Sequence, residues 1–349
     1  MPTRRQINHA LLTGAITSLL ASLTKPGQAV ESSVIKPDRL QSGDRIGIVS
    51  PASATFLRED FDIVADAVRG LGLVPHAAPH IFARRGYLGG TDDMRASDIN
   101  QMFADPNIAA ILPVRGGWGC SRILPYLDYD SIQQNPKILV GFSDLTALIL
   151  GIYAKTGLVT FHGPNGLTGW RTYQTEWFRR ILFEGESPTF VNVRDAADGD
   201  RLMQVNYRIQ TITPGNVQGR LVGGNLSVLS ALVGSPYLPD FQGSILFLED
   251  IGETIYRIDR MMTQLKLAGI LDQIAGFVFG QCRNCRPDES YGSLTLEDVI
   301  WDHIQPLGIP AWYGAMIGHI EPIATLPIGL PVEIDATAGT IAMLESAVI

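Results

Sequence analysis

Short apolar runs alternate with amphipathic stretches along the first half of the chain. The runs at 46–49, 108–114 and 138–140 have the length and composition of buried strands. Between them, 59–71 and 91–104 repeat apolar residues at helical spacing, and the second begins with a threonine suited to cap a helix. This alternation favours a parallel sheet covered on both faces, in which functional sites lie at the carboxyl ends of the strands.

The pattern changes after residue 169. The stretch 170–201 is rich in charge, threonine, glycine and proline, and we interpret it as an irregular crossing between two domains. From 217 the alternation resumes, with a strand at 245–248, a helix at 254–267 and a hairpin over 332–344. We therefore predict an α/β protein with the active site in the cleft between two domains. Its parts are a doubly wound parallel-sheet N-terminal domain at 30–169, a crossing at 170–204 and a smaller mixed α/β C-terminal domain at 205–349.

A serine stands where an apolar run meets a helix-like run. The sequence Gly141-Phe142-Ser143-Asp144 follows the predicted strand 138–140 and precedes a second apolar stretch. A hydroxyl at such a strand-to-helix turn is exposed beside helical N–H groups, which stabilise negative charge. Taken alone, the stretch suits a simple helix cap better than a nucleophile.

Three further segments place useful chemistry after apolar runs. The loop 113–119 carries paired glycines, whose backbone N–H groups can bind an anion, and it matches no nucleotide-binding motif. The strand 244–248 ends in Glu249 and Asp250, and His319 lies in a loop bounded by glycine and proline. Serine, acid and histidine are the parts of a charge-oriented nucleophilic triad.

Together these segments resemble the LD-carboxypeptidases, the serine peptidases also called muramoyltetrapeptide carboxypeptidases. The resemblance implies that Ser143 is the nucleophile, that His319 is the general base and that Glu249 orients the histidine. It also implies that the backbone N–H groups of Asp144 and Gly117 bind the oxyanion. The motifs that carry it, in chain order, are 87–95, 115–119, 141–144, 223–226, 248–250 and 318–319.

The acidic pair needs a choice between its members. Side chains alternate along a strand, so Glu249 and Asp250 should point to opposite faces, and only one can meet His319. The resemblance chooses Glu249. Asp250 is the rival to Glu249, and it could equally cap the helix that begins near Thr254.

Several other side chains are candidates for substrate binding or for rival roles. His162 ends a predicted strand and is a rival to His319 as base, and Cys120 beside the glycine loop is a rival nucleophile, although a buried core role suits it better. A carboxypeptidase also needs a cation for the terminal carboxylate of its substrate, ideally an arginine fork. The available arginines are Arg115, Arg122, Arg257 and Arg260, and the substrate-binding candidates we name are Arg115, Trp118 and His162.

The net charge and the number of cysteines limit the kinds of partner and cofactor that the protein is expected to bind. The chain of 349 residues has a net charge of −8 and no basic run, which argues against nucleic acid as a partner. Cys282 and Cys285 lack the further ligands of a zinc site, so they are either thiols or a disulfide, and the implied chemistry needs no metal or cofactor. The expected partner is a peptidoglycan-derived peptide, and a homodimer is one assembly to consider.

The first 29 residues have the features of an export signal. Arg4 and Arg5 precede an apolar run at 10–23, and 27–29 supplies small residues for cleavage. The run is shorter than the ~18 residues that a membrane span needs, and the paired arginines suggest the twin-arginine route. We expect a periplasmic or otherwise exported protein with no membrane association after signal removal, and a cytoplasmic location is the alternative.

The resemblance implies a specific reaction, the release of terminal D-alanine from a muramoyl tetrapeptide. The amide that is cut joins an L-configured centre of the diamino acid to D-alanine. One alternative is a relative that resembles the microcin C self-immunity peptidases, which cleave an amide in a peptidyl or aminoacyl nucleotide. An aromatic side chain stacked on the nucleotide base would indicate this activity, and Trp170 is the candidate. Another is a non-catalytic exported muropeptide-binding protein, which separated triad side chains would favour.

Overall fold

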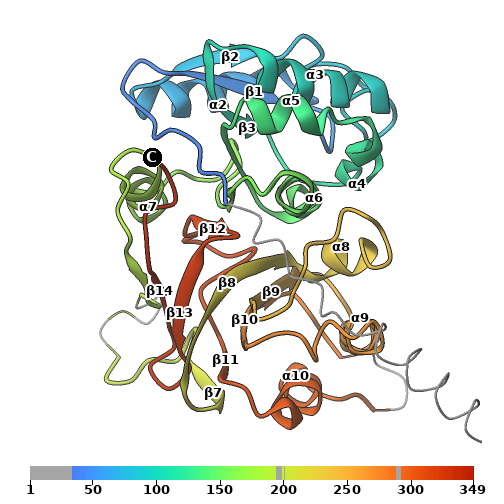
Figure 1. Ribbon diagram of the computed structural model, residues 1–349, viewed down its shortest axis with the longest axis vertical. Helices are drawn as coiled ribbons and strands as arrows, with labels where there is room; N and C mark the ends of the chain where they lie inside the picture. The colour runs from blue at the N-terminus through green and yellow to red at the C-terminus, as the bar shows by residue number, and fades with distance from the viewer. Residues whose placement is uncertain (1–33, 194–198, 200, 288–291) are drawn as a thin grey trace, which may run out of the picture. The chain divides into compact units, whose positions relative to one another are not determined.

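Two β-sheets organise the part of the chain that the computed structural model describes, residues 34–193, 199, 201–287 and 292–349. The first sheet has six strands in the order β12-β5-β4-β3-β1-β2, and the second has eight in the order β6-β14-β13-β8-β9-β10-β11-β7. Figure 1 shows both sheets within the unit Val34–Ile349, with most of the first sheet in blue to green and the second in yellow to red. The predicted α/β fold class is thereby confirmed.

Three strands of the first sheet, β1, β3 and β4, arise from the apolar runs predicted at 46–49, 108–114 and 138–140. Its first five strands in chain order run parallel and are mostly buried, as expected for a parallel sheet covered by helices. They are β1 (Arg45–Val49), β2 (Val74–Ala77), β3 (Ile108–Pro113), β4 (Ile138–Gly141) and β5 (Thr160–His162). The helices between them are α2 (Arg58–Gly70), α3 (Asp92–Ala104), α4 (Cys120–Ile123), α5 (Tyr129–Gln134) and α6 (Thr146–Thr156).

A strand from far along the chain completes this sheet. β12 (Leu326–Ile328) pairs antiparallel with β5, with Leu326 opposite His162. The segment just before β12 carries His319, so this pairing brings the histidine loop toward the end of the sheet that holds Ser143. The first sheet therefore contains residues from both halves of the sequence, and the division at 169 and 204 stays a prediction.

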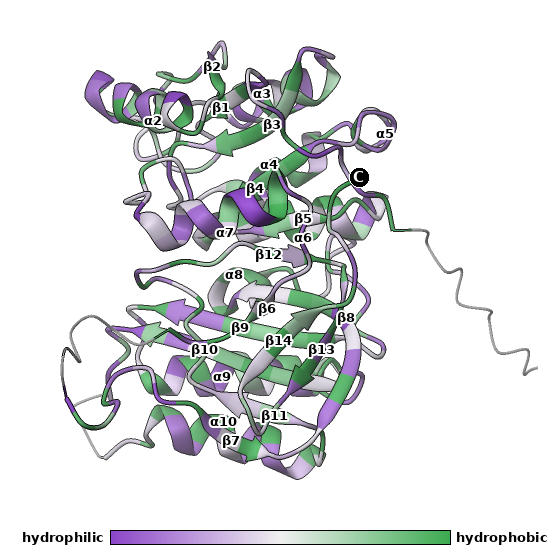
Figure 2. Ribbon diagram, turned by 90° about the vertical axis from the view of Figure 1, so that its left-hand side faces the viewer, coloured by the Kyte–Doolittle hydropathy of each residue, from purple (hydrophilic) through white to green (hydrophobic). Residues whose placement is uncertain are grey.

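The second sheet has a parallel centre and antiparallel edges. β8 (Asn216–Asn225), β9 (Ile245–Ile251), β10 (Gly276–Arg283) and β11 (Ala311–Tyr313) run parallel, and Figure 2 shows apolar residues along β9 and β10. The antiparallel strands are β13 (Pro331–Asp335) and β14 (Thr340–Met343), which follow β8, and the two edge strands β6 (Thr189–Phe190) and β7 (Gln210–Thr213). The helices of this half are α8 (Leu226–Ala231), α9 (Ile255–Leu267) and α10 (Leu296–Ile304).

The stretch that we interpreted as an irregular crossing contains a regular helix. α7 (Thr172–Leu182) buries Gln174, Trp177, Phe178 and Ile181, which are spaced as one helical face. Two arginines, a threonine and a glutamate lie between these positions and obscure the period in the sequence. The prediction of irregular structure was therefore wrong for this segment.

Two membrane-related features close the description of the fold. Across the described ranges, no helix combines the length and apolar character that crossing a bilayer requires. The predicted export signal at 1–29 lies outside the described residues.

Candidate active site

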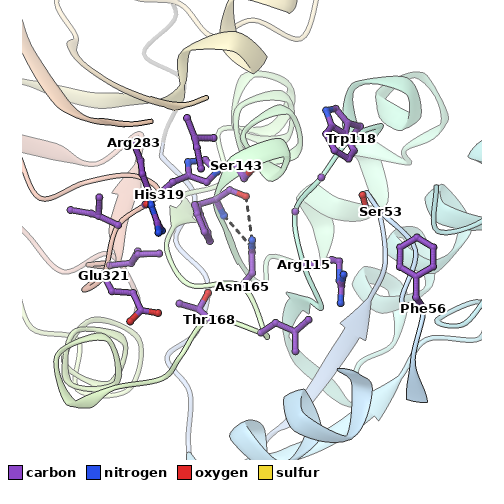
Figure 3. A pocket seen from close by; sticks show the side chains of 17 residues that line it. Ser53, Phe56, Arg115, Trp118, Ser143, Asn165, Thr168, Arg283, His319 and Glu321 are labelled. Atoms are coloured by element: carbon purple, nitrogen blue, oxygen red, sulfur yellow. Dashed lines mark hydrogen bonds between the residues drawn. The ribbon is translucent and has the colours of Figure 1, made fainter. Parts of the chain in front are cut away.

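Ser143 lies at the sharp turn between β4 and α6. It opens a 3-10 turn (Ser143–Leu145), and its φ of 65° is a left-handed value that is uncommon for a residue with a side chain. Gly141 is needed just before it, because a Cβ there would come 2.8 Å from Leu145 Cγ. The N–H of Phe142 donates to Asn165 Oδ1 at 3.2 Å, which ties the turn to the neighbouring loop (Figure 3). The turn holds the serine at the carboxyl end of β4, as predicted from the sequence.

His319 and Glu249 form a hydrogen-bonded pair. His319 Nδ1 lies 2.8 Å from Glu249 Oε2; Glu249 is completely buried on β9, and the histidine side chain is 13% exposed. Gly318 has a φ of 114°, and a Cβ on it would come 2.5 Å from Glu249 Oε2. Only glycine therefore lets the loop pass so close to the carboxylate. With Nδ1 held by the carboxylate, Nε2 is the ring nitrogen available for proton transfer.

Ser143 and His319 line the same cavity, which has a volume of about 540 Å³. Figure 3 shows His319, Arg283 and Glu321 on one side of it and Arg115 and Trp118 on the other, with Ser143 between them. Glu249 lies behind His319 rather than in the wall. The structure thus brings together Ser143, Glu249 and His319, which lie far apart in the sequence.

The glycine loop 115–119 passes directly beside the serine. A Cβ on Gly116 would come 2.9 Å from Ser143 Cβ, and one on Gly117 would come 1.9 Å from Ser53 Oγ. Gly117 also has a φ of 124°, which residues with side chains rarely adopt. Gly117 lines the same cavity as Ser143 and directly follows Gly116, the glycine that lies against the serine.

Buried charges hold the end of this loop against the serine turn. The Asp144 carboxylate accepts a hydrogen bond from the N–H of Cys120 at 2.8 Å, and burial raises the pKa of that carboxyl. From the other side Arg95, which is 1% exposed, donates to the carbonyl oxygens of Pro51 and, at 2.9 Å, Gly119. The motif 87–95 therefore contributes a buried arginine, Arg95, that positions the glycine loop. The sequence analysis did not assign this role.

His162 lies behind the cavity wall. It is completely buried, neither ring nitrogen has a hydrogen-bond partner among the described residues, and burial lowers its pKa to about 4, so the ring is neutral. The ring packs edge-on against Phe142 and Phe247, and Phe142 in turn packs on His319 with ring centroids 4.9 Å apart. This placement corrects the expectation that His162 lines the substrate pocket, and it gives the residue a packing role beneath Phe142.

Cys120 is also buried, at the start of α4. Burial, together with the nearby Asp144 carboxylate, raises the pKa of its thiol well above the ordinary value. A thiol that resists ionisation is a poor nucleophile. The structure thus supports the core role that suited Cys120 better.

Asp250 points away from His319. Its carboxylate accepts hydrogen bonds from Asn225 Nδ2 at 3.0 Å, from the N–H of Ser227 at 2.9 Å and from Ser227 Oγ at 2.7 Å. It therefore supports the start of α8 and does not cap the helix after Thr254, the alternative role considered for it. The two neighbouring carboxylates serve opposite faces of β9, as strand alternation requires.

The candidate arginines are mostly engaged elsewhere. Arg115 lines the cavity, but its guanidinium forms an ion pair with Asp60. Sequence reasoning missed Arg283, which lines the cavity from the end of β10; its position at the carboxyl end of a parallel strand was the available signal. The others lie outside this lining: Arg122 pairs with Asp92, Arg257 pairs with Glu253, and Arg260 stacks over the ring of Tyr256.

Comparison with known proteins agrees with this arrangement. A family model described as the LD-carboxypeptidase N-terminal domain matches residues 46–163, and one described as the LD-carboxypeptidase C-terminal domain matches residues 218–334. Among solved structures, the ligand-free wild-type microcin C7 self-immunity protein MccF superposes with a TM-score of 0.81 at 28% identity. That match covers 90% of this chain and 100% of the MccF chain.

Curated relatives show the same kinship in sequence. The chain is 36% identical over 318 residues to the probable murein peptide carboxypeptidase of Bacillus subtilis, and the match covers 90% of this chain and 95% of the relative. It is 30% identical over 284 residues to the murein tetrapeptide carboxypeptidase of Pseudomonas aeruginosa, and that match covers 79% of this chain and 88% of the relative. With both family domains matched in order and the serine, histidine and glutamate gathered at one cavity, the chain belongs to the LD-carboxypeptidase family.

Proposed function

We propose that this protein is a serine carboxypeptidase that releases terminal D-alanine from the muramoyl tetrapeptides of peptidoglycan. The observation that carries the proposal is the cavity shared by Ser143, in its left-handed turn, and His319, whose Nδ1 is 2.8 Å from the buried Glu249. The relatives named as murein peptide carboxypeptidases support the choice of substrate class.

In the proposed reaction Ser143 Oγ attacks the carbonyl carbon that precedes D-alanine. His319 Nε2 takes the hydroxyl proton, and the Glu249 carboxylate holds the ring in the required tautomer and stabilises the imidazolium. The backbone N–H groups of Gly117 and Asp144 stabilise the tetrahedral oxyanion. The C–N bond then breaks, and His319 returns its proton to the leaving amine, so D-alanine departs as a neutral amine.

The acyl group stays on Ser143 as an ester until water enters. His319 removes a proton from that water, the hydroxide attacks the ester carbonyl, and the C–O bond to the serine breaks as the proton returns to Ser143. Apart from the substrate and water, each step uses only side chains and backbone groups of this chain, so the proposal requires no metal and no organic cofactor.

Purified muropeptides test the proposal directly. We expect incubation of the tetrapeptide with the protein to yield the tripeptide and free D-alanine, seen by mass spectrometry as the loss of one alanine. A pentapeptide that ends in a D,D-bond is the matched control and should remain intact, because its terminal amide joins two D-centres. A tetrapeptide that survives prolonged incubation with well-folded protein would contradict the proposal.

The two alternatives have weaker support. Cleavage of a nucleotide amide would call for an aromatic that stacks on a base, but Trp170 donates its Nε1–H to the carbonyl of Gly166 at 2.8 Å and packs edge-on against Phe178. Trp170 is also absent from the cavity lining. A muropeptide-binding protein without activity would have no need of the buried carboxylate hydrogen-bonded to His319.

We also propose that the protein is exported and that its mature form begins near Val30. The support is the arginine pair, the short apolar run and the small residues at 27–29. N-terminal sequencing of the protein from separated cell fractions should find a cleaved chain outside the cytoplasm. Uncleaved protein confined to the cytosol would reject export and favour a role inside the cell.

A further inference from the structure

Arg283 stands in the wall of the catalytic cavity on the side of the base. It is the last residue of β10 and is paired in register with Ile251 of β9, the strand that carries Glu249. The N–H of Gly252 donates to the Arg283 carbonyl at 2.8 Å, which fixes the backbone of the arginine to that strand. The backbone of Arg283 is therefore anchored to the strand that carries the acid of the triad.

The arginine lies next to the histidine loop. Arg283 donates from one terminal guanidinium nitrogen to the carbonyl oxygen of His319 at 3.4 Å, and Figure 3 shows both side chains on one side of Ser143. In the proposed reaction His319 gives its proton to the leaving amine, so the residue that leaves must lie beside the histidine. In an amino acid only the α-carbon separates that amine from the carboxylate, so the carboxylate must lie on this side too.

Arg283 is also available for a ligand. No carboxylate of the described residues lies within ion-pair distance of its guanidinium, whereas Arg115 on the opposite side is held by Asp60. Glu321 shares the wall with Arg283, and its negative charge is balanced by Arg171, whose Nε is 3.1 Å from the carboxylate. An incoming carboxylate would thus meet a cation that has no carboxylate partner among the described residues.

A disulfide closes across Arg283 at the end of β10. Cys282 and Cys285 are bonded, which closes a four-residue ring around Arg283 and Asn284 and decides between the two states that the sequence left open. A short covalent ring restricts the backbone at Arg283, so less conformational freedom is lost when a ligand is bound. The cation is presented on a preorganised support.

We infer that Arg283 binds the terminal carboxylate of the substrate, and so makes the cavity specific for peptides with a free carboxyl terminus. The inference rests on the function proposed above. A guanidinium fits a carboxylate with two parallel N–H···O bonds, and such charge-assisted bonds are strong and directional. Arg283, rather than Arg115, then decides between exopeptidase and endopeptidase behaviour at this site.

Two substrates that differ in one group test the inference: the tetrapeptide with a terminal D-alanine acid and the same peptide with a terminal D-alaninamide. We expect the wild type to prefer the acid. Arg283→Met should raise KM for the acid about 10- to 100-fold, the usual effect of losing hydrogen bonds to a charged group, and should leave the amide nearly unchanged. The KM of Arg283→Lys for the acid should lie between those of the wild type and Arg283→Met, because lysine keeps the positive charge but not the forked guanidinium.

Arg286→Gln is the matched control. Arg286 follows the same disulfide and is exposed, but it is outside the cavity lining, so this variant should keep the wild-type preference. Arg283→Met that retains full preference for the acid would overturn the inference, as would a preference lost only in Arg115→Met. A wild type that cleaves neither peptide rejects the proposed function instead. Calorimetry with Ser143→Ala then decides separately: tighter binding of the acid that depends on Arg283 supports the inference, and equal binding of both peptides overturns it.

Discussion

Replacing Ser143 with alanine should abolish turnover and leave substrate binding nearly intact. The change removes the attacking oxygen, and loss of a triad nucleophile costs about 10⁴- to 10⁶-fold in rate. Serine and alanine tolerate the left-handed φ of 65° similarly, so we expect the folded structure to persist. Steady-state turnover of the tetrapeptide and calorimetric binding of the same peptide check the two parts of this expectation.

The matched control is Cys120→Ala. This thiol is buried with a raised pKa, so its removal should leave the rate within a few-fold of wild type and cost some stability through a small cavity. Activity of Ser143→Ala within about tenfold of the wild type would contradict the assignment of Ser143 as the nucleophile. If Cys120→Ala were the inactive variant, the thiol would take the serine's place in the mechanism.

Replacing Glu249 with glutamine should lower the rate by about 10³- to 10⁴-fold, comparable to the loss of the acid in other triads. The amide keeps the volume of the side chain but removes the negative charge 2.8 Å from His319 Nδ1. Because Glu249 is completely buried, water cannot replace that charge when the imidazolium forms. The measurement is kcat for the tetrapeptide, with circular dichroism to establish that the variant is folded.

The neighbouring carboxylate gives the control for this change. Asp250→Asn should cost far less in rate and about 1 kcal/mol in stability, because Asp250 accepts hydrogen bonds from Asn225 and Ser227 at the start of α8. Its effect should therefore appear in the melting temperature. A slow but stable Asp250 variant beside a near-normal Glu249 variant would reverse the roles of the two acids.

Local patterns were sufficient for three strands of the first sheet, β1, β3 and β4, and for the serine turn. Apolar runs such as 108–114 become buried parallel strands because their side chains leave water on both faces of the sheet, a consequence of composition and length. The turn at Ser143 was predictable because a strand, a glycine and a helix follow one another within a few residues. The helix α7 was missed because charged residues between its buried positions masked the helical period.

The sequence by itself determined the α/β class, the family-like motifs and the choice of a serine at a strand end, since each depends on residues close together in the chain. Only the tertiary structure decided which distant groups meet. The pairing of β12 with β5, together with Gly318 against Glu249, brings His319 to the cavity and leaves His162 buried beneath Phe142. The parallel pairing of β9 with β10 sets Arg283 beside the triad. These contacts depend on how strands and loops from separate parts of the chain pair and pack, and local periodicity carries no information about that packing.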